Sequence, residues 1–150
     1  MKNIVWILAT LLLTACAAVT PPISEASPSA RTVSDLPDAY QQFQGVWEVR
    51  SAQRGAAPMD DKIGVRAHLE GNPFRFDGDS GFEIIDIDTS VEPHRIDFWE
   101  KGTAVQGVFR IAGETLVVCS APPGVSRPTG LDSRANSRYI TFEAQRVREK

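Results

Sequence analysis

The amino-acid sequence predicts an all-β fold: a small eight-stranded up-and-down antiparallel barrel. From residue 43 onward, short runs of strand-forming residues are separated by turn residues every 8–12 positions. Several runs alternate apolar and polar residues, which is typical of strands with one buried face. No amphipathic helix period of useful length interrupts them.

The expected strands follow one another through mostly short connections. They are the runs 45–53, 63–70, 74–76, 82–88, 95–99, 104–111, 115–119 and 138–147. The second run alternates strictly, with its odd-numbered residues from Ile63 to Leu69 on one face. Turns are predicted at Gly71-Asn72-Pro73, Asp77-Gly78 and Ala112-Gly113. An eight-stranded meander has two exposed edges unless it closes, so a barrel is favoured over a sandwich.

The N-terminal segment, residues 1–15, is typical of an exported protein. Lys2 precedes an apolar run, residues 4–13, that is too short to span a membrane. Leu13-Thr14-Ala15-Cys16 resembles the lipobox of bacterial lipoproteins, which implies cleavage before Cys16 and lipidation of this residue. The alternatives are a plain signal peptide cut after Ala17 and an uncleaved anchor. Because Ala17 stands where a retention signal would often carry Asp, the resemblance implies the periplasmic face of the outer membrane in a diderm host.

Residues 16–42 are predicted to form a lipidated cysteine followed by a flexible tether. The tether leads to a folded domain over residues 43–150. Prolines among many Ala and Ser residues leave no strand or helix period. A flexible chain of about 26 residues reaches roughly 25–30 Å. Residues 36–42 are expected to form a short helix or turn. If Cys16 is lipidated, Cys119 has no partner in the chain, and a small packing residue is favoured over a reactive thiol.

Two patterns resemble known families. Gly45-Val46-Trp47 is similar to the G-x-W signature of lipocalins, which implies that Trp47 plugs one end of the barrel and that Arg146, from the last strand, packs over it. Over 43–148 the chain resembles an uncharacterised small lipocalin-like domain family first described in Planctomycetes proteins. The matching stretches are FQGVWEV, GVFRIAGETLVVC, APPGVSRPTG and ITFEAQRV. This resemblance implies a fold but no activity.

The candidate contacts for a ligand or partner are Phe76, Phe109, Phe142 and Arg127. The phenylalanines either line a pocket or fill the barrel, and the small size of the domain favours filling. A cavity of about 300 Å³ or more would favour ligand binding. Arg127 belongs to the long connection 120–137. That connection is either a lid or partner-docking loop in which Arg127 binds a carboxylate or phosphate, or, as favoured, a rigid cap over the barrel end in which Arg127 bonds carbonyls.

Other patterns indicate no catalytic or metal site, and no cofactor is expected. Gly78-Asp79-Ser80-Gly81 resembles the nucleophile motif of trypsin-like proteases, but the chain is too short for their double barrel. The acidic residues between positions 77 and 88 lack EF-hand spacing, and His68, His94 and Cys119 lack zinc spacing. With 16 basic and 19 acidic residues, the formal charge of -3 gives no cationic excess to attract nucleic acid.

The sequence therefore predicts a non-enzymatic binding module at the cell envelope. A lipid anchor would hold it to a membrane, and the barrel would take a small apolar ligand or an envelope protein. The alternative is a structural or interaction domain with a filled core and no ligand.

Overall fold

The computed structural model describes residues 38–71, 73–77 and 81–148. Its strands are β1 (Gly45–Arg54), β2 (Ala57–Pro58), β3 (Arg66–Leu69), β4 (Pro73–Phe76), β5 (Phe82–Asp88), β6 (His94–Glu100), β7 (Thr103–Ala112), β8 (Thr115–Ala121) and β9 (Ile140–Val147). Its short helices are α1 (Asp38–Gln41), η2 (Asp60–Lys62) and η3 (Ser133–Ala135). None of the helices in these ranges is long and apolar enough to cross a membrane. The predicted signal peptide, the lipobox and the tether up to residue 37 lie outside the described residues.

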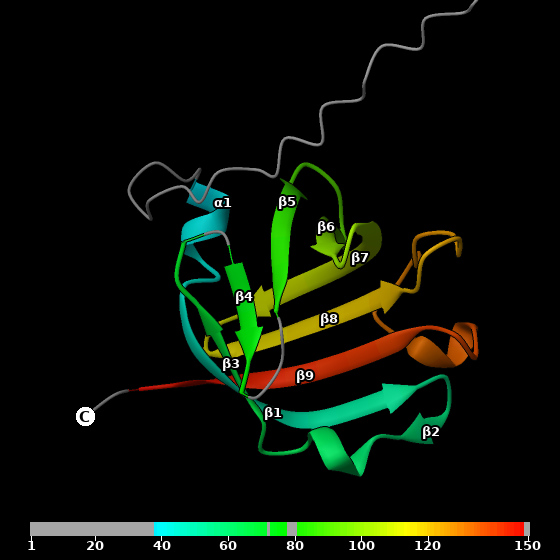
Figure 1. Cartoon of the computed structure of the whole chain (residues 1–150), viewed down its shortest axis with the longest axis horizontal. Helices are drawn as coiled ribbons and strands as arrows, with labels where there is room; N and C mark the ends of the chain where they lie inside the picture. The colour runs from blue at the N-terminus through cyan, green and yellow to red at the C-terminus, as the bar shows by residue number, and fades with distance from the viewer. Residues whose placement is uncertain (1–37, 72, 78–80, 149–150) are drawn as a thin grey trace, which may run out of the picture.

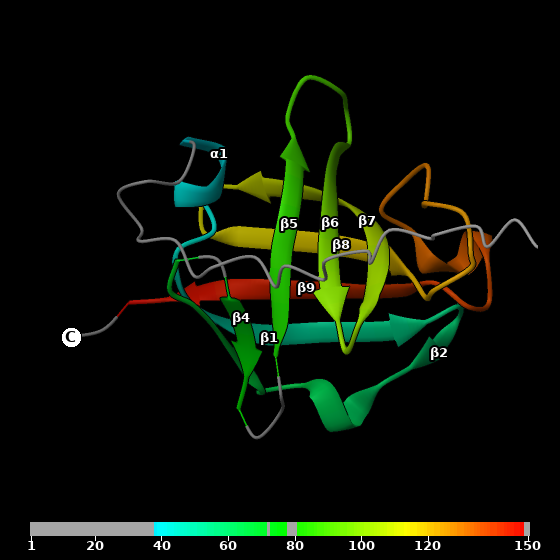
Figure 2. The ribbon, with the colours of Figure 1, turned by 45° about the horizontal axis from the view of Figure 1, so that its top comes forward.

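Eight of the strands close into an antiparallel barrel, which confirms the predicted fold class. Strands β3 to β9 pair in chain order, β1 pairs with β3, and β9 pairs with β1 to close the sheet. The short β2 pairs with β1 alone and is an extra strand that the sequence does not predict. Figures 1 and 2 show β1, β8 and β9 running across β4 and β5, as strands do on opposite walls of a tilted barrel.

Most strand boundaries differ from the predicted ones by one to three residues, and three of the differences show where the chain turns. β3 begins only at Arg66 because η2 and Gly64, with a φ of +83°, turn the chain before it. Ile63 therefore lies outside the strand and is 52% exposed instead of facing inward. The turn between β7 and β8 is Gly113-Glu114, one residue later than predicted, because Gly113 takes the positive φ of +58°. β9 begins at Ile140, two residues after the predicted start.

The core fills the inside of the barrel and depends on a bulge in β1. Trp47 and Val49 both face inward and are almost fully buried. The register between β1 and β9 shifts between Val49 and Ser51, so the alternation of faces changes by one residue. Ala52, 3% exposed, is consequently also buried.

Trp47 plugs the end of the barrel at which β1 begins. Its side chain is fully buried, and its Nε1 donates a hydrogen bond to the Phe43 carbonyl oxygen at 2.7 Å. The Arg146 guanidinium carbon lies 4.1 Å from the centroid of the indole ring. Arg146 also donates hydrogen bonds to the carbonyl oxygens of Gln42, at 2.7 Å, and Gln44. The first and last strands are thereby joined around one aromatic ring.

Gly45 makes room for this arrangement. Its φ is +111°, and a Cβ on it would lie 3.2 Å from an Arg146 guanidinium nitrogen. A larger residue would therefore press against the cation that covers Trp47. This geometry gives the Gly45-Val46-Trp47 pattern and Arg146 a shared physical role.

Candidate binding cavity and the strap on the barrel wall

A narrow apolar cavity lies inside the barrel beside the Trp47 plug. Its volume is about 70 Å³. Six phenylalanines line it together with Trp47 and smaller aliphatic side chains, and the almost fully buried Phe43 and Trp47 form its inner end. Of the described residues that line it, Ser120 alone carries a hydroxyl group. The cavity therefore offers an almost purely apolar surface.

The cavity opens toward the end of the barrel opposite Trp47. Phe76 ends β4, Phe82 begins β5, and Phe142 lies near the start of β9. These three side chains line the cavity but remain only half-buried, as does Ser120 near the end of β8. Residues that line a cavity and keep contact with solvent mark its mouth.

Five aromatic rings form most of one wall of the cavity. They belong to Phe74, Phe76, Phe82, Phe98 and Phe142. Neighbouring ring centroids lie 4.8–6.2 Å apart in edge-to-face or tilted contacts, a range that favours aromatic pairs. The rings therefore fill much of the barrel and line what remains. At 70 Å³ the remaining space is far below the roughly 300 Å³ at which pockets for compact ligands begin.

The three predicted aromatic contacts do not all lie at the cavity. Phe76 and Phe142 both line the cavity. Phe109 does not: it is 2% exposed and packs edge-on against Phe43, with centroids 4.6 Å apart, near the plugged end. Phe109 is therefore a packing residue, whereas Phe43, which the sequence analysis did not select, reaches the cavity from the segment between α1 and β1.

Residues 122–139, the strap, connect β8 to β9 and cover the outer face of the barrel. Val108 and Cys119 are register partners on β7 and β8, on the face opposite the cavity-lining Val118. Both are nevertheless buried, at 3% and 0% exposure. Val125 and Pro128 of the strap are buried as well. The strap therefore encloses a small second core outside the barrel.

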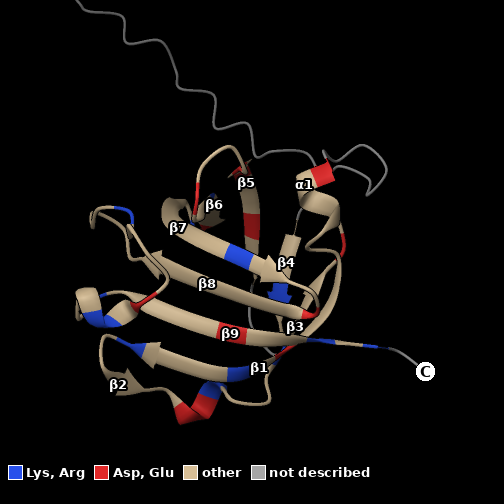
Figure 3. Cartoon of the chain, turned by 180° about the vertical axis from the view of Figure 1, so that it is seen from behind, with Lys and Arg blue, Asp and Glu red and all other residues tan. Residues whose placement is uncertain are grey.

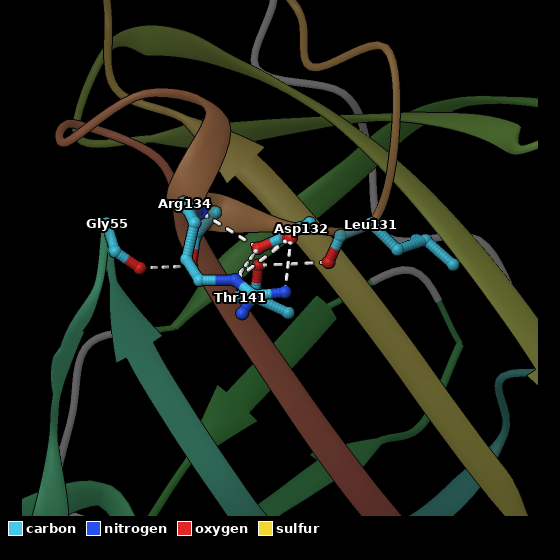
Figure 4. A network of polar contacts seen from close by, with 6 residues as sticks. Gly55, Leu131, Asp132, Arg134 and Thr141 are labelled. Atoms are coloured by element: carbon cyan, nitrogen blue, oxygen red, sulfur yellow. Dashed lines mark hydrogen bonds and ion pairs between the residues drawn. The ribbon is translucent and has the colours of Figure 1, made fainter.

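Polar contacts fasten the strap to the neighbouring strands (Figure 4). The Ser133 hydroxyl, fully buried, donates a hydrogen bond to the Gly55 carbonyl oxygen at 2.7 Å. The Thr141 hydroxyl donates to the Leu131 carbonyl oxygen at 3.2 Å. Within the strap, Arg134 and Asp132 form a bidentate pair with bonds of 2.8–3.0 Å. These contacts fix the strap against the outer face of the barrel, whereas the favoured prediction is a cap over the barrel end, and no described contact places it as a lid over the cavity mouth.

Arg127 fastens the strap to the barrel wall. Its guanidinium donates hydrogen bonds to the carbonyl oxygens of Gly107, at 2.8 Å, and Ile96, at 3.3 Å. It also lies 2.6 Å from the Asp97 carboxylate. Its donors are thus engaged by β6 and β7, and the interpretation of Arg127 as bonding carbonyls is correct.

Replacing Arg127 by Met is expected to lower the free energy of unfolding by about 2 kcal/mol, because hydrogen bonds to a charged group contribute about 1.5–3 kcal/mol and this pair retains some solvent. Urea denaturation measures the loss. The matched control is Arg110→Met, which breaks an exposed pair with Glu92 and should cost no more than about 0.5 kcal/mol. Equal losses in the two variants would contradict the fastening role.

Cys119 is buried beneath the strap as a free thiol. Burial raises the pKa of this thiol above its ordinary value, although a hydrogen bond with Thr141 opposes the shift. The thiol is therefore protonated at neutral pH. Its environment is that of a small packing residue.

The described residues contain no group of three or more His, Cys, Asp and Glu side chains placed to hold a metal ion. His68 lies 2.8 Å from the Asp77 carboxylate, and His94 bonds the Val91 carbonyl oxygen at 2.8 Å.

Residues 78–80 of the protease-like motif lie outside the described part of the chain. Figure 3 shows acidic and basic residues interspersed around the barrel.

Comparisons of the chain with protein-family models, curated proteins and solved structures gave no match. The resemblance to a lipocalin-like family therefore stays a prediction.

Proposed function

We propose that the chain is an envelope-anchored lipoprotein whose barrel is a non-enzymatic binding module for the narrow end of an apolar chain. The observation that carries the proposal is an apolar cavity with half-buried phenylalanines at its mouth and a plug at its far end. The lipobox at Leu13-Thr14-Ala15-Cys16 supports the anchor.

The size of the cavity favours a chain end over a compact ligand. A volume of 70 Å³ corresponds to about two or three water-sized groups. An alkyl chain can place its last carbons in such a space while the rest stays outside. Each buried CH₂ contributes about 0.8 kcal/mol, so even a short insertion gives measurable affinity.

A series of n-alkyl carboxylates from butanoate to decanoate tests the cavity. We expect the dissociation constant to fall about fourfold per added carbon, the equivalent of 0.8 kcal/mol, over about three carbons and then to level off. Isothermal titration calorimetry with the full chain in a maltoside detergent, below the micelle concentration of each carboxylate, measures the series. The length at which affinity levels off reports the depth of the cavity.

A matched pair of variants on β8 separates the cavity from the outer surface. Ser120→Phe places a ring at the cavity mouth and should weaken binding at least tenfold. Val117→Phe adds the same ring on the opposite face of the strand and should leave binding unchanged. Undiminished binding in Ser120→Phe, or no binding by the native chain, would favour the filled structural domain. Native mass spectrometry of protein purified from its own envelope then shows whether a lipid or a protein partner accompanies it.

Cys16→Ala tests the anchor. We expect the variant to leave the membrane fraction, because the thiol that receives the lipid is gone and several acyl chains are what make such anchorage lasting. Fractionation with immunoblotting measures this. Cys119→Ala is the control and should stay with the membrane. Membrane association of Cys16→Ala equal to that of the native chain would rule out lipidation at this residue.

A further inference from the structure

A second hollow lies on the outside of the barrel, where β4, β5 and β6 run side by side. Its volume is about 300 Å³. We name it the notch and define it by four side chains that line it: Arg75, Glu83, Trp99 and Lys101. Phe82, which lines the barrel cavity, also borders the notch. Phe82 is thus a residue that the two spaces share.

Strand register brings these four side chains together. Glu83 on β5 pairs with Pro73 on β4 and with Trp99 on β6, so the three residues form one row across the outer face. Arg75 lies two residues beyond Pro73 and therefore on the same face of β4. Lys101 follows β6 in a turn and has a φ of +46°. The seam between β4 and β5, whose residues help to line the notch, holds only two register pairs among the described residues.

Two features of the notch are unusual for a solvated sheet surface. Trp99, a large aromatic side chain on the outer face, is 38% exposed. The Glu83 Oε2 atom is buried and has no hydrogen-bond partner among the described residues. A buried acceptor without a donor costs about as much as a lost hydrogen bond, so such an atom is a sign of a missing partner.

The two cations of the notch are also unpaired. Within residues 38–71, 73–77 and 81–148, neither Arg75 nor Lys101 forms an ion pair, whereas Arg127 and Arg146 are both paired. Counting only partners among the described residues, the notch therefore presents two cations without an ion pair, one acceptor without a donor, and an aromatic face.

We propose that the notch binds a zwitterionic group in which a phosphate is joined by two carbons to an ammonium. The ammonium lies against the face of Trp99 and donates to Glu83 Oε2, because an indole face attracts a cation and the carboxylate lacks a donor. The phosphate lies between Arg75 and Lys101. A purely anionic ligand would leave Glu83 without a donor, and a purely cationic one would meet two like charges. The assignment does not depend on the function proposed for the cavity.

The proposal is tested with phosphoethanolamine on the full chain in a maltoside detergent. Nuclear magnetic resonance follows the indole N–H signal of Trp99, which Trp99→Phe identifies. We expect a saturable shift of this signal with a millimolar dissociation constant. Phosphate alone and ethanolamine alone should each bind at least tenfold more weakly, because each engages half of the notch. Equal binding of either fragment, or no shift with phosphoethanolamine, overturns the proposal.

Variants link binding to the notch. Glu83→Gln and Arg75→Gln should each weaken binding at least fivefold, while melting temperature shows that both are folded. Arg95→Gln is the matched control, since Arg95 is an exposed cation on β6 outside the notch, and it should bind like the native chain. If Arg75→Gln proves unfolded, Lys101→Gln takes its place. Native affinity in folded Glu83→Gln and Arg75→Gln also overturns the proposal.

The same chemistry occurs as a free metabolite and as a lipid head group. Lysophosphatidylethanolamine with a six-carbon acyl chain, used below its micelle concentration, distinguishes the two sources. A gain of tenfold or more over phosphoethanolamine indicates the head group of a lipid whose chain reaches past Phe82. Equal affinity indicates the free zwitterion. In both cases the notch is the site, and loss of the gain in Ser120→Phe shows whether the cavity receives the chain.

Discussion

Replacing Trp47 by Ala is expected to lower the free energy of unfolding by about 3–5 kcal/mol. The indole is fully buried, donates a hydrogen bond to Phe43 and lies beneath the Arg146 guanidinium. Its removal leaves a cavity at the plugged end, takes the donor from the Phe43 carbonyl oxygen and takes the aromatic ring from beneath the Arg146 guanidinium. Because domains of this size are commonly stable by only about 5–15 kcal/mol, the loss is a large fraction of the total. Urea denaturation followed by far-ultraviolet circular dichroism measures it.

Trp99→Ala is the matched control for this experiment. Trp99 is the same residue type on the outside of the same barrel, and it is 38% exposed. We expect its removal to cost about 1 kcal/mol or less, since much of the indole is in contact with water in the native state. A near-neutral effect of Trp47→Ala would show that the indole does not support the barrel.

Gly55→Ala is expected to lower the free energy of unfolding by about 3 kcal/mol and to loosen the strap. Gly55 has a φ of +58°, which costs an L-residue about 1–2 kcal/mol. A Cβ at this position would also lie 2.8 Å from the Ser137 Cα, so the backbone of the strap would have to move. Denaturation gives the stability, and hydrogen exchange of the amide at Gly55, which donates to Tyr139, reports the loosening.

Gly113→Ala separates the two causes. Gly113 also has a φ of +58°, but a Cβ there meets no atom within 4 Å. It should therefore show the backbone cost alone, about 1–2 kcal/mol. Equal losses in both variants would mean that contact between Gly55 and the strap contributes nothing to stability.

The strand content could be predicted because each strand carries its own local signal. Run 82–88 was located correctly because strand-forming residues lie between clear turn residues on both sides. Closure of the sheet into a barrel could also be predicted, since eight strands in a meander have few other ways to cover their two edges. Residue 63 was placed wrongly because its alternation with Val65 continues across Gly64, where the chain in fact turns. An alternation of apolar and polar residues does not show where the backbone takes a positive φ, as it does at Gly64.

The site was less predictable because it depends on register and on depth along the barrel. Phe109 is a candidate contact because it is an aromatic residue in a strand run, but a strand pattern gives no height along the barrel axis and therefore does not predict the burial of this ring against Phe43. The pairing of Glu83 with Trp99 depends on how β5 and β6 align beside a bulge at Ile85, which no local pattern specifies. The path of the strap depends on contacts such as that between Arg127 and Gly107, which lie far apart in the chain.

The plug has a consequence for the direction from which the barrel can be reached. α1 leads into β1 beside Trp47, and β9 ends beside Arg146, so the chain enters and leaves the barrel at its plugged end. The segment that precedes Asp38 therefore joins the domain at its plugged end. With an anchor at Cys16, the tether would join the membrane to the plugged end and would leave the mouth of the cavity clear of the attachment.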